Sequence, residues 1–242
     1  MFKFFRNIRK NLLNEGKTTR YFKYAIGEIV LVVIGILIAL QINNWNEANK
    51  AAKEELKILK EMQFNLTNDL MDCDWNINKQ QELANSNTIV LNHLENRTPF
   101  SDSLRFHYGN LMYSTTQRRN MAAYDHLKAK GIDLIQNDSL RRHITAVYSE
   151  RYYFIEKQEL EYDNQIHLNE LLPQLNAKLI YDNISKTGYP IDLPSLQNDN
   201  VFKGTLRMQI NARKYMKQRY EGLLTDLKNL IAHIDEELKE RQ

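Results

Sequence analysis

The chain has few of the residues that cross-link a fold or interrupt helices. Its 242 residues include one cysteine, four prolines and eight glycines. The single Cys73 excludes an intramolecular disulfide framework, so stability must come from packing or from pairing between chains. Neither glycine nor proline occurs between Glu47 and Asn96, which permits a long uninterrupted helix.

Motifs for chemistry are also missing. Serine, histidine and aspartate are present, but no nucleophile elbow, phosphate loop or zinc motif surrounds them. No two of the six histidines are three or four residues apart, and no cysteine or carboxylate pair with metal-ligand spacing accompanies them. We therefore expect no enzyme activity, no metal site and no cofactor.

Net charge is small, at +3, and the excess lies at the front of the chain. Seven basic residues but only one acidic residue, Glu15, precede position 24. The rest of the chain is close to neutral, so the sequence gives no reason to expect a nucleic-acid partner.

An apolar run follows this basic segment. Ile29 to Leu40 would give about 18 Å of helix, and the wider run from Ala25 to Ile42 about 27 Å, close to the roughly 30 Å core of a bilayer. The aromatic residues expected to anchor the two membrane interfaces are Tyr21 and Tyr24 on one side and Trp45 on the other.

These features predict a transmembrane helix over residues 24–45. The basic flank places residues 1–23 in the cytoplasm and residues 46–242 in the periplasm as one domain. The run is long for a signal peptide and no cleavage site follows it, so we expect an uncleaved, single-pass anchor in the inner membrane.

Residues 1–23 have apolar and basic helical faces. Such a segment can lie flat on an anionic leaflet, whereas the alternative is a disordered basic tail that only fixes topology. The residues expected to bind lipid headgroups are Lys3, Arg6, Arg9 and Lys10.

One face of the expected span carries Glu28, Gly35, Ala39 and Asn43. Small residues four apart allow close helix packing in lipid, so this face predicts association of identical spans into a homo-oligomer, with Glu28 bonding to a neighbour. Two alternatives stay open for Glu28: it snorkels to the headgroups, or a ring of such residues conducts protons or ions.

Beyond the span the chain reads as helical. A 4-3 apolar spacing runs from Ala52 to Leu94, with ten of thirteen positions apolar, and predicts a coiled-coil-like rod that continues the spanning helix. Its polar exceptions, Gln63, Gln80 and Asn87, are of the kind that specifies register.

Four further helices are expected. Short ones cover about 101–114 and 119–130, a long one begins at Asn137 or Asp138 and is kinked or ended by Pro173, and the last covers 199–240. Residues 184–198 are expected to form a loop, and no strand is evident. The expected inner face of the long helix is Leu140, Ile144, Tyr148, Tyr152, Ile155, Tyr162 and Ile166. The predicted fold class is all-α: one N-terminal transmembrane helix followed by a long-helix bundle.

Two weaker signals concern the periplasmic part. Tyr148, Tyr152 and Arg141 could line a pocket for an anionic ligand, or the tyrosines could simply pack in the core. Ser103 and Ser139 follow aspartates as in short O-glycosylation sites, but each also suits a helix N-terminus.

The segment 27–47, GEIVLVVIGILIALQINNWNE, resembles a family of uncharacterised single-span membrane proteins of Bacteroidota, chiefly flavobacteria. Residues 123–141 are similar to a later pattern of the same family. The resemblance implies an inner-membrane protein with a periplasmic helical domain, and it supplies no catalytic residue.

Three functions are therefore considered. The first is a self-associating membrane anchor or scaffold whose periplasmic domain binds envelope proteins. The second is a sensory, ligand-binding bundle that signals through a partner. The third is a proton- or ion-conducting oligomer that uses Glu28.

Overall fold

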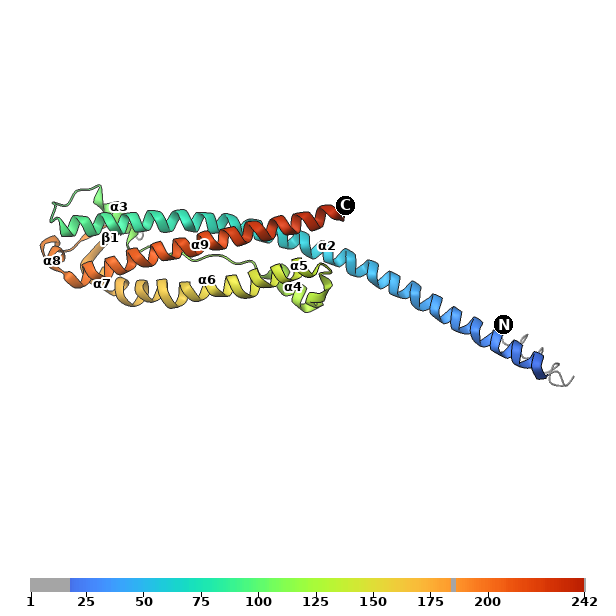
Figure 1. Ribbon diagram of the computed structural model, residues 1–242. Helices are drawn as coiled ribbons and strands as arrows, with labels where there is room; N and C mark the ends of the chain where they lie inside the picture. The colour runs from blue at the N-terminus through green and yellow to red at the C-terminus, as the bar shows by residue number, and fades with distance from the viewer. Residues whose placement is uncertain (1–17, 184–185, 242) are drawn as a thin grey trace. The chain divides into compact units, whose positions relative to one another are not determined.

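A computed structural model describes residues 18–183 and 186–241 of the chain (Figure 1). It divides into two compact units, Met1–Glu55 and Leu56–Gln242. The helices and strands are α2 (Thr18–Glu95), α3 (Leu104–Asn110), α4 (Ala122–Lys130), η1 (Ile132–Leu134), α5 (Asp138–Thr145), η2 (Ala146–Arg151), α6 (Tyr152–Gln158), η3 (Glu159–Asp163), η4 (Gln165–Leu171), α7 (Leu172–Lys178), β1 (Leu179–Asn183), β2 (Thr187–Pro190), α8 (Leu193–Asn198) and α9 (Asn200–Glu240).

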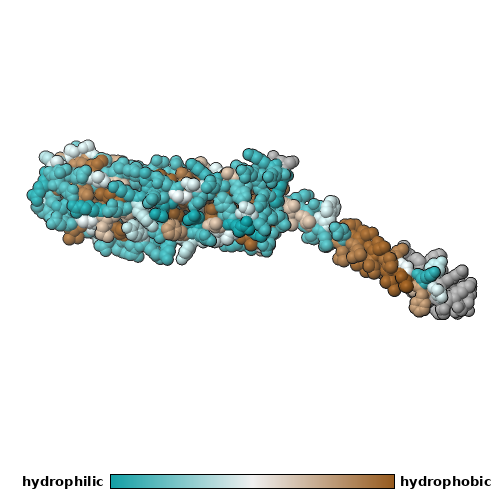
Figure 2. Space-filling model, in the orientation of Figure 1, coloured by the Kyte–Doolittle hydropathy of each residue, from teal (hydrophilic) through white to brown (hydrophobic). Residues whose placement is uncertain are grey.

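The described part of the first unit is the beginning of α2. Its apolar side chains are exposed; Ile29 and Leu37, for example, keep 63% and 59% of their accessible surface. Figure 2 shows these residues as a brown segment of the helix. The predicted continuity of the apolar run with the following rod is confirmed, because α2 is one 78-residue helix.

The second unit is a bundle of three long helical segments: the remainder of α2, the run from α5 to α7, and α9 (Figure 1). Asp199 caps α9, since its Oδ1 accepts a hydrogen bond from the Phe202 N–H at 2.9 Å. This helix, predicted over 199–240, buries one apolar face from Met216 to Leu238. The all-α fold class is therefore correct for the bulk of the chain.

Two apolar cores form within the bundle. The first joins Ile58–Ile77 of α2 to α4, α5, α6 and the Met216–Leu238 part of α9. The second joins Val90–Leu94 to α3, α7, α8 and the Phe202–Ile210 part of α9. Polar residues occupy the interior between them.

The two short helices are shorter than predicted. Helix α4 ends at Gly131, whose φ of +100° favours glycine, but it begins at Ala122 instead of 119. The chain before it stays extended because α2 supplies acceptors: the Asn120 N–H donates to the Asp69 carboxylate at 3.0 Å. Helix α3 covers only Leu104–Asn110, and Ser103 makes no side-chain cap.

The α5–α7 run contains three π-helical segments, η2, η3 and η4, that the sequence did not reveal. The predicted inner face is correct from Leu140 to Ile155 and wrong beyond it. Tyr162 is 44% exposed and Ile166 is half-buried. The buried side chains instead continue at every fourth position, with Glu159, Asp163, His167 and Leu171, because a π turn takes more residues than an α turn. Pro173 lies in the first turn of α7 and does not end the run.

The predicted loop over 184–198 and the absence of strands were wrong. Strands β1 and β2 form an antiparallel hairpin that pairs Ile180 with Tyr189, and Leu193–Asn198 is helix α8. Asp192 caps α8 by accepting a hydrogen bond from the Ser195 N–H at 3.2 Å. The hairpin packs on α3, where Gly109 lets the Lys186 backbone approach closely.

Candidate functional site

The exposed apolar start of α2 is the first candidate site. It is the one helix, within the described residues, that is long and apolar enough to cross a membrane. An 18-residue window of it has a mean hydropathy of 2.6, and none of that window is buried. An exposed apolar surface of this extent marks a site of contact with a membrane or with another protein.

The side chains predicted to pack in the membrane lie along this helix. Glu28 is half-buried, whereas Ala39 and Asn43 are exposed. Apart from the adjacent helix backbone, no described atom lies within 4 Å of the position that a Cβ on Gly35 would take, so the surface around this glycine is open. The association predicted for this face stays a prediction.

The predicted interface anchors are accessible where the structure describes them. Tyr24 is 56% and Trp45 67% exposed. The side chain of Tyr21 and the headgroup-binding residues predicted at the front of the chain lie outside the described residues. The latter are Lys3, Arg6, Arg9 and Lys10.

The second candidate site is a polar layer inside the bundle, between the two apolar cores. All three long helical segments contribute to it, and its side chains are at most 3% exposed. The polar layer consists of Asn76, Gln80, Asn87, Glu159, Asp163, His167, Gln209 and Arg213.

Arg213 is the most demanding member of the polar layer because its charged side chain is wholly buried. Burial lowers the pKa of Arg213 to about 10, and the nearby Asp163 carboxylate opposes this shift. Arg213 Nη2 donates to the Tyr113 carbonyl at 2.7 Å, and the amide of Gln209 donates to Asp163 Oδ1 at 3.1 Å. Nε and Nη1 of Arg213 have no hydrogen-bond partner among the described residues.

Glu159 is held by two neutral donors and by the charged Arg119, whose Nη1 lies 3.7 Å from Glu159 Oε2. Its Oε1 accepts hydrogen bonds from the Gln117 N–H at 2.7 Å and the Tyr220 hydroxyl at 2.8 Å. Burial raises the pKa of the Glu159 carboxyl in spite of these donors. Beside the layer, Asp69 is similar: the Tyr152 hydroxyl donates to it at 2.6 Å, and burial raises the pKa of the Asp69 carboxyl.

His167 and two amides complete the polar layer. Burial, followed by the charge of Arg213, lowers the pKa of His167 to about 4, so the imidazole is neutral at pH 7. The side-chain amide of Asn87 makes no hydrogen bond among the described residues, and that of Gln80 makes none of normal geometry there, although it lies close enough to the Asp163 carboxyl to lower its pKa. Buried polar atoms without partners cost about 1–3 kcal/mol each, so the layer is a weak section of the bundle.

The sequence located part of this layer. Gln80 and Asn87 were predicted as polar positions of the α2 seam, and both are fully buried. Glu159, Asp163 and His167 were missed because the prediction assumed a regular α-helix. In a helix with 3.6 residues per turn these side chains would point away from the core. Their spacing of four residues was the available signal.

The residues of the predicted ligand pocket are engaged in contacts within the chain, and the rings of Tyr148 and Tyr152 meet edge to face with centroids 5.4 Å apart. Tyr148 stacks on Tyr124 with ring centroids 4.6 Å apart, and the hydroxyl of Tyr152 is taken by Asp69. Arg141 binds Asp138 at 2.7 Å and the Ile135 carbonyl at 2.9 Å. The tyrosines therefore pack in the core.

The fold brings together two histidines that are far apart in sequence. The Nδ1 atoms of His143 in α5 and His233 in α9 lie 3.2 Å apart. Burial and His233 both lower the pKa of His143. No three His, Cys, Asp or Glu side chains form a metal-binding group within the described part of the chain.

Comparison with known protein families gives a match over more than half of the chain. The model of DUF6090, a family of unknown function, matches residues 28–174, from the apolar segment of α2 into α7. No curated protein and no solved structure shows significant similarity to the chain.

Proposed function

The chain belongs to the DUF6090 family, and we propose that it is a membrane-anchored interaction protein whose helical bundle binds partners outside the cytoplasm. The observation that carries the proposal is the exposed apolar beginning of α2, followed along the chain by a unit with its own cores. Such a segment is stable in lipid and unfavourable in water.

The proposed topology is single-pass, with the N-terminus in the cytoplasm and the bundle in the periplasm of a Gram-negative cell. Its support is the excess of Lys and Arg before the span. The family resemblance of residues 27–47 supports the same arrangement. Self-association through the face with Gly35 and Ala39 belongs to the proposal, with small residues allowing close approach of two helices.

Anchoring is tested by fractionation of cells that express the full chain. The wild type should stay with the membranes after salt and alkaline washes. Replacing both Ile34 and Leu37 by lysine should release it, because charges at the bilayer centre are costly. Lysine at Ala52, an exposed position outside the apolar segment, is the matched control and should stay in the membrane. Recovery of the wild type in the soluble fraction would end the proposal.

Orientation is tested by cysteine labelling. Cys73 is buried, so it is replaced by alanine, and a cysteine is placed at the exposed Glu240 of α9. A membrane-impermeant maleimide should label this cysteine in cells with a permeabilised outer membrane. Labelling only after lysis of the inner membrane would mean that the bundle lies in the cytoplasm, opposite to the proposed topology.

The polar layer favours a second candidate function, a bundle that changes helix register on binding a ligand and passes the change to a partner. Two apolar cores separated by a poorly satisfied polar layer can rearrange at lower cost than one continuous core. A metabolite panel in a thermal-shift assay tests this, since a ligand at about 100 times its Kd raises stability by about 2.7 kcal/mol.

A further inference from the structure

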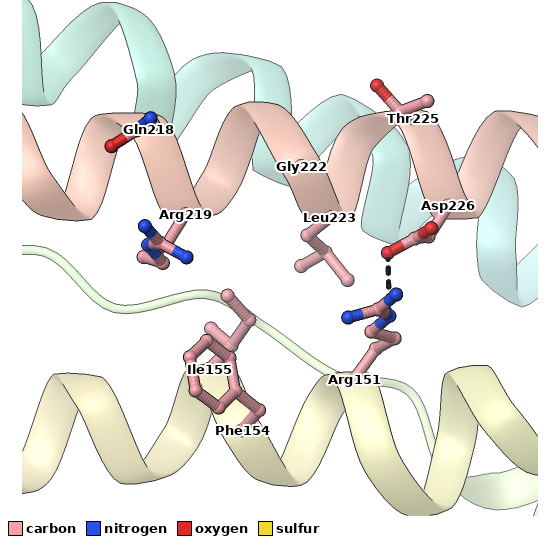
Figure 3. Close-up of a pocket in the computed structure, with 9 residues that line it drawn as sticks. All are labelled: Arg151, Phe154, Ile155, Gln218, Arg219, Gly222, Leu223, Thr225 and Asp226. Atoms are coloured by element: carbon pink, nitrogen blue, oxygen red, sulfur yellow. Dashed lines mark ion pairs between the residues drawn. The ribbon is translucent and has the colours of Figure 1, made fainter.

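A pocket of about 350 Å³ lies between the η2–α6 run and α9 (Figure 3). This volume falls in the range of small-molecule sites, about 300–1,000 Å³. The residues that line it are Arg151, Phe154, Ile155, Gln218, Arg219, Gly222, Leu223, Thr225 and Asp226.

The pocket combines an apolar wall with basic groups at its ends. Leu223 and Ile155 are nearly buried, and Phe154 is 39% exposed, so an apolar ligand body would cover surface that water now wets. Figure 3 shows Leu223 between Arg219 and Arg151, both of which point toward the space between the helices.

The two arginines differ in their partners. Arg151 Nε lies 3.0 Å from Asp226 Oδ2, so its charge is compensated. Arg219 has no carboxylate within ion-pair distance in the part of the chain that the structure describes, and its buried Nε lacks a hydrogen-bond partner there. The ring of Tyr215, 4.7 Å from the guanidinium, holds Arg219 in place. Arg219 is therefore a fixed cation whose N–H donors are available to a ligand.

From this arrangement we infer that the pocket binds a small monocarboxylate with an apolar body, with the carboxylate on Arg219 and the body on Phe154 and Leu223. The planar fork of a guanidinium matches a carboxylate. At the other end Arg151 and Asp226 compensate each other, so among the described residues the pocket has no second free cation for a dianion and should disfavour phosphate. The inference concerns binding alone and depends neither on membrane anchoring nor on self-association.

The test uses the full chain in detergent micelles with benzoate as the probe, observed by saturation-transfer difference NMR. Benzoate should bind. Benzamide has the same shape without the charge, so its affinity should be lower by about tenfold or more, because a charge-assisted hydrogen bond is lost. Inorganic phosphate should not compete. Equal binding of benzoate and benzamide, competition by phosphate, or no benzoate signal would overturn the inference.

Two variants locate the binding. Arg219→Gln should abolish the preference for benzoate over benzamide, while Lys214→Gln, an exposed position on the same helix, should keep it. Gly222→Leu should block both probes by filling the pocket, because nothing beyond the adjacent helix backbone lies within 4 Å of the added Cβ. Gly204→Leu makes the same change at another open glycine of α9 and should leave binding intact. Benzoate binding that survives both Arg219→Gln and Gly222→Leu would place the ligand elsewhere.

Discussion

At the residue scale, Arg213 shows what a buried charge requires of its neighbours. A guanidinium that is wholly removed from water is tolerated when a carboxylate and backbone acceptors replace the lost hydration. Here Asp163 supplies the charge and the Tyr113 carbonyl accepts one hydrogen bond. Arg213 is the cation of the polar layer, and the charge of Asp163 opposes the lowering of its pKa, so each partner depends on the other.

Arg213→Met is therefore expected to destabilise the bundle by about 3 kcal/mol at pH 7, since it leaves the Asp163 carboxylate buried without its counter-charge. Adding Asp163→Leu should restore most of the loss, because an apolar pair of similar volume removes the uncompensated charge. Urea unfolding followed by circular dichroism measures both variants. A double variant as unstable as the single one would mean that the pair does not act as a unit.

His167 predicts how stability depends on pH. Its pKa is lowered to about 4 in the fold but lies near 6.5 in the unfolded chain, so the unfolded state binds the proton first as pH falls. The resulting loss of stability is absent above pH 6.5 and grows to about 3 kcal/mol as pH approaches 4. His167→Gln should remove this loss.

The measurement is the difference in unfolding free energy between wild type and His167→Gln from pH 7.5 to 4.5. The buried acids Asp69, Glu159 and Asp163 have raised pKa values and act in the opposite direction, since their penalty diminishes as pH falls. The difference between the two proteins cancels their contribution. Parallel pH profiles would show that His167 is not buried in its neutral form.

At the element scale, Gly109 allows α3 and the β1–β2 hairpin to pack closely. A Cβ on Gly109 would lie closer to the Lys186 backbone than Cβ atoms in proteins lie to other atoms. A backbone segment cannot rotate away from such a contact as a side chain can. Gly109→Ala should therefore displace the hairpin and destabilise the second core by about 1–3 kcal/mol.

Gly204→Ala is the matched control for this change. No atom lies within 4 Å of its added Cβ, and alanine in a helix interior is favoured over glycine by about 1 kcal/mol, so this variant should be more stable than wild type. Thermal unfolding of the two variants gives the comparison. Equal effects of the two alanines would contradict the close contact at Gly109.

The elements also show where a sequence pattern is sufficient. The α9 helix follows one regular apolar period and an Asp cap, so its bounds and face were predictable from residues 199–240. The α5–α7 run was predictable only to Ile155, because each π turn changes the period that the pattern assumes. The β1–β2 hairpin was missed because strands of five and four residues are too short to show alternation, and the hairpin also depends on its packing against α3.

At the scale of the whole molecule, the composition of α2 changes along its length. Its beginning has exposed apolar side chains, and its later turns bury one face in the bundle. The apolar beginning was evident from the sequence because it needs no tertiary context. Of the polar layer only the α2 positions Gln80 and Asn87 were evident, because the layer depends on three segments far apart in the chain.

The proposed association of the spans gives a last prediction. Gly35→Leu should split the detergent-extracted oligomer, because a bulky side chain on the small-residue face keeps two helices apart. The open space around Gly35 means that the change creates no clash within the chain, so a smaller assembly would reflect lost association and not misfolding. Gly27→Leu, the same change at an open glycine about a quarter turn from this face, should keep the assembly. Native mass spectrometry measures the subunit number of all three proteins, and an unchanged number for Gly35→Leu would remove this face from the interface.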